Sequence, residues 1–161
     1  MTFTCTADEN GKKLGDILRA RGFSRKLITR LKRTENGILR NSQPVRTVDT
    51  VFCGNVITVT ESDTGGAAAN PALDVRILYE DEHLAVFDKP PLMPCHESIK
   101  HRGDTLSNFF AAHCPNTVFR CINRLDRDTS GCVVVAKSAF ARTLCKKAAK
   151  RCMSAFARIC R

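Results

Sequence analysis

The sequence contains no tryptophan, a single tyrosine (Tyr79) and no apolar run long enough to cross a bilayer. Its N-terminal stretch also lacks the apolar core of a secretory signal. None of the nine cysteines belongs to a Cys-x-x-Cys pair, and their number is odd. We therefore expect a cytoplasmic protein that keeps its thiols reduced and does not span a membrane.

Histidine and cysteine adjoin each other twice, as Cys95-His96 and His113-Cys114, with His101 nearby. The spacing between these pairs fits no compact pattern of zinc ligands. No cysteine stands out as a nucleophile with a base placed beside it. The sequence therefore predicts no metal site and no cysteine chemistry.

Acidic residues are scarce in two parts of the chain. Residues 12–46 carry eleven lysines and arginines against Asp16 and Glu35, and residues 137–161 carry eight against none. The centre, residues 47–136, has twelve acidic and seven basic residues, and the whole chain has a net charge of +10. Concentrated positive charge attracts polyanions in a salt-dependent way, so RNA, DNA and anionic membranes are all candidate partners at this level.

The first sixty residues predict a small helix-helix-β unit. A short strand at 2–6 precedes an amphipathic helix at about 12–21, which Gly22 ends. Ser24 can cap a second helix that runs to about Arg33. After the Asn36-Gly37 turn, short strands are expected at 38–40, 44–46, 51–52 and 56–59.

The order of these pieces resembles the small RNA-binding domain named after ribosomal protein S-four. The matching pieces run from Gly11 to Arg25, from Asn36 to Val45 and from Gly54 to Val59. The resemblance implies that RNA phosphates are contacted by Ser24, Arg25, Lys26, Arg30 and Arg33. From charge alone, the same helix face is equally compatible with a solvated surface.

Residues 61–75 are small, polar and rich in breakers, which predicts a linker. A second unit then begins with a β-hairpin, followed by a loop that carries His96 and His101. Asp104 can cap the helix that comes next. The expected elements are strands at 76–80, 84–87, 118–121 and 132–136 and a helix at about 105–113.

Neither glycine nor proline occurs from Ser138 to the end of the chain. Apolar side chains recur there every four residues, at Phe140, Leu144, Ala148, Cys152 and Phe156. This pattern predicts one long basic amphipathic helix, which could lie on a membrane or in a partner's groove. The favoured interpretation is a helix that faces the core and has a solvated basic back.

Residues 122–131 form a charged loop that runs directly into an apolar strand. Asp126 and Asp128 stand in it among Arg124 and Arg127. From residue types alone, such a loop is either a solvated turn or a place where a carboxylate performs chemistry.

The run Asn-Arg-Leu-Asp-Arg-Asp-Thr-Ser-Gly at 123–131, followed by an apolar strand and Ala-Lys, resembles the signature of RluA-type RNA pseudouridine synthases. The stretches 77–82 and 87–90, with His96, resemble that family's first catalytic-domain motif. An S-four-like module ahead of such a domain is the family's arrangement.

The resemblance implies an α+β protein. Its expected parts are a helix-helix-β RNA-binding domain at 1–60, the linker at 61–75 and the N-terminal part of a mixed-sheet catalytic domain at 76–161. The basic helical tail diverges from the family from about residue 143.

The implied activity is the isomerisation of uridine to pseudouridine in structured RNA, rRNA ahead of tRNA. The expected protein is a monomer without a metal or other cofactor and without a membrane as partner. Asp126 corresponds to the essential aspartate, which either attacks a sugar carbon or removes a sugar proton. Arg124 corresponds to the arginine that helps extrude the base, with Asn123 and Arg127 beside it. The two arginines would help to keep Asp126 ionised. The loop is shaped by Thr129, Ser130 and Gly131.

The sequence also departs from the family. The family has a later active-site tyrosine and a Lys or Arg that pairs with the aspartate, yet no tyrosine follows Tyr79 here. Residues 76–161 are few for a complete domain of this type. We therefore expect a C-terminally truncated homologue with exposed sheet edges and apolar faces. It is either an active synthase or an inactive homologue that only binds RNA.

Overall fold

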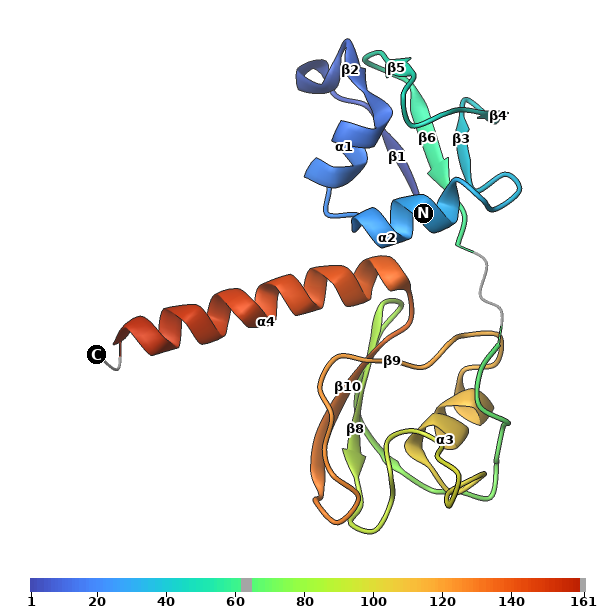
Figure 1. Ribbon diagram of the computed structural model, residues 1–161, viewed down its shortest axis with the longest axis vertical. Coiled ribbons are helices and arrows are strands. Elements are labelled where there is room, and N and C mark those ends of the chain that lie inside the picture. The colour runs from blue at the N-terminus through green and yellow to red at the C-terminus, as the bar shows by residue number, and fades with distance from the viewer. Residues whose placement is uncertain (62–64, 160–161) are drawn as a thin grey trace. The chain divides into compact units, whose positions relative to one another are not determined.

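The computed structural model describes residues 1–61 and 65–159, and the side chains of 1–61 and 65–150. It consists of two compact units, Met1–Ser62 and Asp63–Arg161 (Figure 1). Both combine helices with antiparallel sheets, so the chain is an α+β protein.

The first unit has two helices and short strands, in the predicted order. Its four-stranded sheet has the order β1-β6-β3-β4, and β2 pairs with β5. The first helix begins two residues later than predicted, because Lys12 and Lys13 pair with Val51 and Thr50. The elements are β1 (Thr2–Thr4), η1 (Ala7–Glu9), β2 (Lys12–Lys13), α1 (Leu14–Ala20), α2 (Arg25–Leu31), β3 (Ile38–Arg40), β4 (Gln43–Pro44), β5 (Thr50–Val51) and β6 (Val56–Val59).

Helix α2 separates its apolar and basic residues onto opposite sides. Leu27, Ile28 and Leu31 are buried, at the i, i+1 and i+4 positions expected of one helix face. The predicted N-cap is confirmed, since the Ser24 hydroxyl accepts a hydrogen bond from the Leu27 amide at 3.1 Å. This packing fixes which side of α2 remains outside.

The turn after α2 requires its glycine because of close packing. Asn36 adopts a left-handed conformation with φ 53°, and a Cβ on Gly37 would lie 2.3 Å from the Leu31 carbonyl oxygen. Any larger residue at position 37 would displace the end of α2 or the start of β3.

The second unit is built on one four-stranded sheet with the order β7-β8-β10-β9. Its elements are β7 (Arg76–Glu80), β8 (Leu84–Lys89), α3 (Leu106–His113), β9 (Arg120–Cys121), β10 (Gly131–Ala136) and α4 (Ala139–Ile159). The expected mixed sheet is wrong for the described residues, because every strand pair among them is antiparallel. Gly131 lies opposite Lys89, so the chain re-enters the sheet at the end where it left it and must run antiparallel.

The core of this unit lies between one sheet face and α3. Phe87 is fully buried at the centre, with its ring centroid 5.6 Å from that of Phe109 and 6.1 Å from that of Phe110. The buried cluster also includes Val75, Ala85, Cys95, Leu106, Cys121, Val133 and Val135.

The predicted cap of α3 is wrong by one residue. Thr105, not Asp104, is the N-cap, and it forms a capping box with Asn108. Asp104 instead bonds His101, with its Oδ2 2.7 Å from His101 Nδ1. The box forms because the Asn108 Oδ1 accepts from the Thr105 amide, as a Glu or Gln would.

Part of the stretch predicted to be a linker packs on this unit. The Asn108 Nδ2 donates to the Ala68 carbonyl at 2.7 Å, and the Asn70 Nδ2 donates to the Gly103 carbonyl at 2.6 Å. Val75 lies in the core. Buried amide partners thus hold a breaker-rich segment that has little apolar surface of its own, whereas residues 62–64 lie outside the described residues.

Strand β7 has exposed apolar side chains. Its residues Ile77, Leu78 and Tyr79 are 37%, 42% and 53% exposed, which confirms the expectation of exposed apolar side chains.

Helix α4 forms as predicted, but the interpretation that it faces the core holds only for its first turn. Of its described side chains only Ala141 is buried, and Leu144 is 40% exposed. Cys152 and Phe156 lie outside the residues whose side chains are described, and 160–161 lie outside the described chain.

Candidate active site

Residues 122–130 are hereafter called the Asp126 loop. The loop begins beside β10 and leads back into the start of that strand. The Ile122 amide donates to the Val134 carbonyl at 2.8 Å. The Asn123 side chain then binds β10 twice, because its Nδ2 donates to the Cys132 carbonyl and its Oδ1 accepts from the Val134 amide, both at 2.9 Å. Asn123, predicted to act near the substrate, therefore uses both polar atoms of its side-chain amide to hold the loop against β10.

Lys89 holds the Asp126 loop from its buried side. Strand β8 alternates, so Ala85, Phe87 and Lys89 share its buried face, and Lys89 is fully buried. Its Nζ donates to the carbonyls of Pro90 at 2.8 Å, Met93 at 2.7 Å and Arg127 at 3.1 Å. Burial lowers the pKa of Lys89. One ammonium thus ties the end of β8 to the middle of the Asp126 loop.

Two buried thiols extend this support. The Cys95 Sγ donates to the Leu125 carbonyl at 3.4 Å, and the Cys121 Sγ donates to the Asn123 carbonyl. Burial raises the pKa of Cys121 to about 12, so the thiol remains a neutral donor. The carbonyls of residues 123, 125 and 127 are therefore all bound by donors from the core side.

Asp126 lies on the outer side of this fixed backbone. It is exposed, and a turn follows it in which the Thr129 amide donates to the Asp126 carbonyl at 3.2 Å. No hydrogen bond or ion pair to the Asp126 carboxylate occurs among residues 1–61 and 65–150. Gly131 has φ +133° where the loop enters β10, and Ser130 is exposed. The carboxylate is thus accessible on a loop whose backbone is held.

The two arginines of the loop have different surroundings. The Arg127 Nη1 lies 3.3 Å from the Asp128 Oδ1, so its charge is directed at its neighbour and not at Asp126. Arg124 is exposed near His96, whose ring centroid lies 5.0 Å from that of Phe119 in an edge contact. The pKa of His96 is lowered, first by desolvation and then by the charges of Arg124 and Arg142.

At the opposite end of β10, an ion-pair network joins three elements. The Lys137 Nζ lies 2.7 Å from the Glu80 Oε1, and the His113 Nε2 lies 2.7 Å from the Glu80 Oε2. Glu80, His113 and Cys114 place possible metal-ligand atoms within 4.8 Å of one another. Because Lys137 and His113 already bind both oxygens of the Glu80 carboxylate, we interpret these contacts as a structural ion-pair network and not as a metal site.

This network makes the second unit sensitive to acid. Hydrogen bonds from Lys137 and His113 lower the pKa of Glu80 to about 2 from the usual 4.5. The resulting stabilisation is present above pH 4.5 and is lost as the pH falls toward 2. We expect Glu80→Gln to cost about 1–2 kcal/mol at pH 6, after allowance for solvent screening, and progressively less below pH 4.5.

Urea unfolding followed by Tyr79 fluorescence measures this effect in the second unit, because Tyr79 is the only tyrosine. Glu82→Gln is the matched control, since Glu82 is exposed in the turn after β7. The assignment fails if wild type and Glu80→Gln keep the same stability difference at pH 6 and pH 3.

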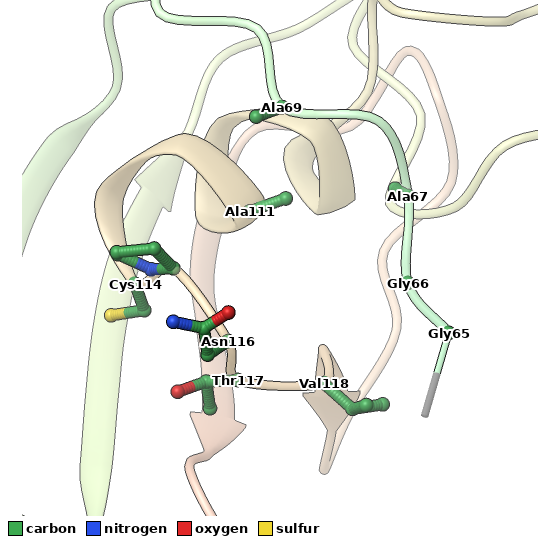
Figure 2. Close-up of a pocket in the computed structure, with 10 residues that line it drawn as sticks. Gly65, Gly66, Ala67, Ala69, Ala111, Cys114, Asn116, Thr117 and Val118 are labelled. Carbon is green, nitrogen blue, oxygen red and sulfur yellow. The ribbon is translucent and has the colours of Figure 1, made fainter. Parts of the chain in front are cut away.

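A depression of about 320 Å³ lies elsewhere in this unit, between residues 65–69 and the end of α3 (Figure 2). Its walls are mostly small side chains and backbone, from Gly65, Gly66, Ala67, Ala69, Ala111, Cys114, Pro115, Asn116, Thr117 and Val118. No residue of the Asp126 loop lines it. The depression offers neither a carboxylate nor a cation, so it is a poor place for the chemistry of Asp126.

The RNA contacts predicted in the first unit share the outer side of α2. Arg25, Lys26 and Arg33 are exposed. Arg30 is also exposed, but its Nη2 lies 3.1 Å from the Glu61 Oε2, so the carboxylate partly offsets the positive charge of Arg30. Ser24 serves as the cap. These residues form a separate set from the Asp126 loop.

Residues 83–154 match the sequence pattern of the family described as RNA pseudouridylate synthase. Residues 83–154 of this chain therefore carry the sequence pattern of the pseudouridine synthase family. The matched residues include Lys89 and the whole Asp126 loop, and the family's members are isomerases. The family match therefore covers the part of the second unit in which the loop, its supporting lysine and its supporting thiols lie.

The curated relatives are longer than this chain. Ribosomal large subunit pseudouridine synthase D of Pseudomonas aeruginosa is 36% identical over 104 residues, which are 62% of this chain and 32% of that protein. An uncharacterized RNA pseudouridine synthase of Bacillus subtilis is 30% identical over 135 residues, 80% of this chain and 48% of that protein. The chain thus spans a third to a half of the length of these synthases.

A solved structure also resembles the chain. Human RNA Pseudouridylate Synthase Domain Containing 1 is 27% identical, covering 50% of this chain and 28% of that chain, with a TM-score of 0.36.

Of the helices in residues 1–61 and 65–159, none combines the length and hydropathy needed to span a membrane.

Proposed function

We propose that this chain isomerises uridines to pseudouridine in structured rRNA, with Asp126 as the catalytic carboxylate. The observation that carries the proposal is the exposed carboxylate on a loop held by Asn123 and Lys89, within the residues that match the synthase family. The choice of rRNA is supported by relatives named as ribosomal large subunit synthases.

The reaction breaks the bond between the uracil nitrogen and the ribose and forms a carbon–carbon bond through carbon 5 of the same base. The proton lost from carbon 5 is balanced by a proton gained at the nitrogen that is released. Asp126 assists the first step, either by attacking the sugar carbon or by removing a sugar proton to give a glycal-like intermediate. Fixing the loop backbone lets the carboxylate meet the sugar without reorganisation.

The target uridine must leave its helix before Asp126 can reach its sugar. Base extrusion costs unstacking energy, which side chains at the site offset. Arg124 is exposed in the loop and is the residue we assign to this step, with Arg127 following Asp126 in the sequence. Asn123 acts indirectly, by holding the loop against β10.

The RNA is also bound by the basic side of α2, in the first unit. In this proposal Arg25, Lys26, Arg30 and Arg33 bind phosphates, and Ser24 caps the helix and donates from its hydroxyl. Such contacts position the RNA without reading its sequence.

A second function is favoured by one observation. Within the described side chains no partner faces the Asp126 carboxylate, and no tyrosine follows Tyr79 in the sequence. The alternative is therefore a protein that binds RNA through α2 and does not turn it over.

One experiment separates the two functions. The full chain is incubated with unmodified large-subunit rRNA, pseudouridine is mapped at nucleotide resolution, and RNA affinity is measured in parallel. A wild-type product at defined uridines supports the synthase. Binding that Arg25→Gln with Lys26→Gln weakens, without any product, supports the binding protein. A wild-type chain that neither binds nor modifies the RNA rejects both.

A further inference from the structure

Helix α4 carries a row of basic side chains that the fold does not use. Arg142, Lys146 and Lys150 follow at intervals of four, so they lie on one side of the helix, and all three are exposed. We call these three residues the α4 basic stripe. It covers about 12 Å of helix at 1.5 Å per residue.

The stripe has no acidic partners within its own helix. Residues 138–161 contain no aspartate or glutamate. Basic residues of the first unit differ in this respect, because Arg19, Arg21 and Arg46 each pair with a carboxylate. Like charges four residues apart destabilise a helix. A row of three such charges therefore lowers the stability of α4 until an anion binds along it.

The stripe lies in the same unit as the Asp126 loop, after the end of β10 that is farther from that loop. Helix α4 contacts β9 and β10 at its start, and Figure 1 shows the remainder extending past the sheet of this unit. Arg142 in the first turns of α4 and Arg124 in the Asp126 loop both act on the His96 imidazole. His96 therefore has positive charge near it from both the Asp126 loop and α4.

The composition of residues 142–150 favours RNA over a lipid surface as the ligand of the stripe. A helix that lies in a membrane needs large apolar side chains opposite its charges. Between residues 142 and 150 the only large apolar side chain is Leu144, and the other apolar residues there are Cys145, Ala148 and Ala149. A polyanion that binds by charge alone needs no such face, and a duplex carries about one charge per 1.7 Å.

We propose that the α4 basic stripe is a second phosphate-binding surface, which holds the RNA helix adjoining the target uridine. This rests on the proposed function, because it takes the same RNA as ligand. It adds a contact surface on the catalytic unit that is distinct from the residues assigned on α2. The stripe binds the phosphates of the stem and carries no sequence preference.

The test measures the salt dependence of RNA binding by the full chain. A fluorescein-labelled rRNA hairpin is titrated at 50–200 mM KCl with wild type and with Arg142→Gln, Lys146→Gln, Lys150→Gln combined. Each lost phosphate contact lowers the slope of log affinity against log salt by about 0.7–0.9. We expect the triple variant to lose about two units of slope and on the order of tenfold in affinity at 100 mM.

Two control variants fix the interpretation. Lys12→Gln, Lys13→Gln and Arg76→Gln combined remove the same charge from other exposed positions and are expected to leave most of the slope. Lys146→Arg with Lys150→Arg keeps the charge and is expected to keep the slope. Glutamine is a good helix former, so circular dichroism should show α4 intact in the triple variant.

The outcomes distinguish this inference from the proposed function. An unchanged slope in the triple variant, together with a reduced slope in Arg25→Gln with Lys26→Gln, rejects the stripe and keeps the RNA function. Equal losses in the triple variant and its charge-matched control also reject the stripe. Loss of binding to phosphatidylglycerol vesicles without loss of RNA affinity would mean a lipid surface instead. Absence of RNA binding by wild type rejects both proposals.

Discussion

Asp126→Asn is expected to lower the rate of pseudouridine formation by about 10³-fold or more. The asparagine is nearly isosteric, so the backbone held by Lys89, Cys95 and Asn123 should not move. What is lost is the negative charge and the basicity needed at the sugar. RNA affinity should remain within a factor of about two, because the side chain makes no contact that holds the loop. Single-turnover assays on an rRNA fragment measure the rate.

Asp128→Asn is the matched control for this prediction. Asp128 lies two residues away, is 73% exposed in its side chain and pairs only with Arg127 at 3.3 Å among the described contacts. An exposed pair of this kind contributes little, so activity should fall by less than about threefold. Comparable losses in both variants would show that the rate of pseudouridine formation depends on the total charge of the loop and not on the carboxylate of Asp126.

Lys89→Met is expected to destabilise the second unit by about 3–5 kcal/mol. Methionine matches the length and apolar stem of lysine but donates no hydrogen bond. The carbonyls of Pro90, Met93 and Arg127 would lose the ammonium that they share. A buried carbonyl without a donor costs about 1–3 kcal/mol, and partial access of water limits the sum. Urea unfolding followed by Tyr79 fluorescence reports on this unit alone.

Lys100→Met provides the comparison, because Lys100 is exposed in the loop at 92–103. Its effect should lie within about 0.5 kcal/mol. Lys89→Met should also reduce pseudouridine formation, since the Arg127 carbonyl adjoins Asp126. A loss of less than about 1 kcal/mol would mean that water replaces the ammonium and that the loop does not depend on Lys89.

The local elements were largely predictable. Helix α2 forms where Ser24 and the spacing of Leu27 and Leu31 predict it, and the β7–β8 hairpin forms around Asp81. The Asp81 Oδ1 accepts from the His83 and Leu84 amides at 2.7 Å, so the turn is stabilised by one residue and its neighbours. These elements depend on contacts within a few residues, which the sequence pattern contains.

The misassigned positions depend on contacts that the pattern does not contain. Asp104 and Thr105 are both good caps, and the choice between them follows from the buried position of Thr105 and from Asn108. The periodicity of α4 matches a core-facing helix, yet Leu144 is exposed, because the periodicity cannot say whether another element lies opposite it.

The candidate site shows the same division. The motif at 123–131 predicts Asp126 and Arg124 as site residues, but it does not predict the role of Lys89 in holding the loop. A signal existed, because a lysine at an alternating apolar position of a strand must find partners when buried. Its acceptors include Arg127, 38 residues later, and no local rule names a partner at that separation.

The sequence by itself predicts the resemblance to the family, the candidate aspartate and the two concentrations of basic charge, because each depends on nearby residues in the sequence. Only the tertiary structure decided how the Asp126 loop is held. The pairing of β8 with β10 brings Lys89 opposite Gly131, and the run of chain beside β10 places the Asn123 amide between Cys132 and Val134. Hydrogen-bond partners of this kind are set by strand register, which is fixed when the sheet packs against α3.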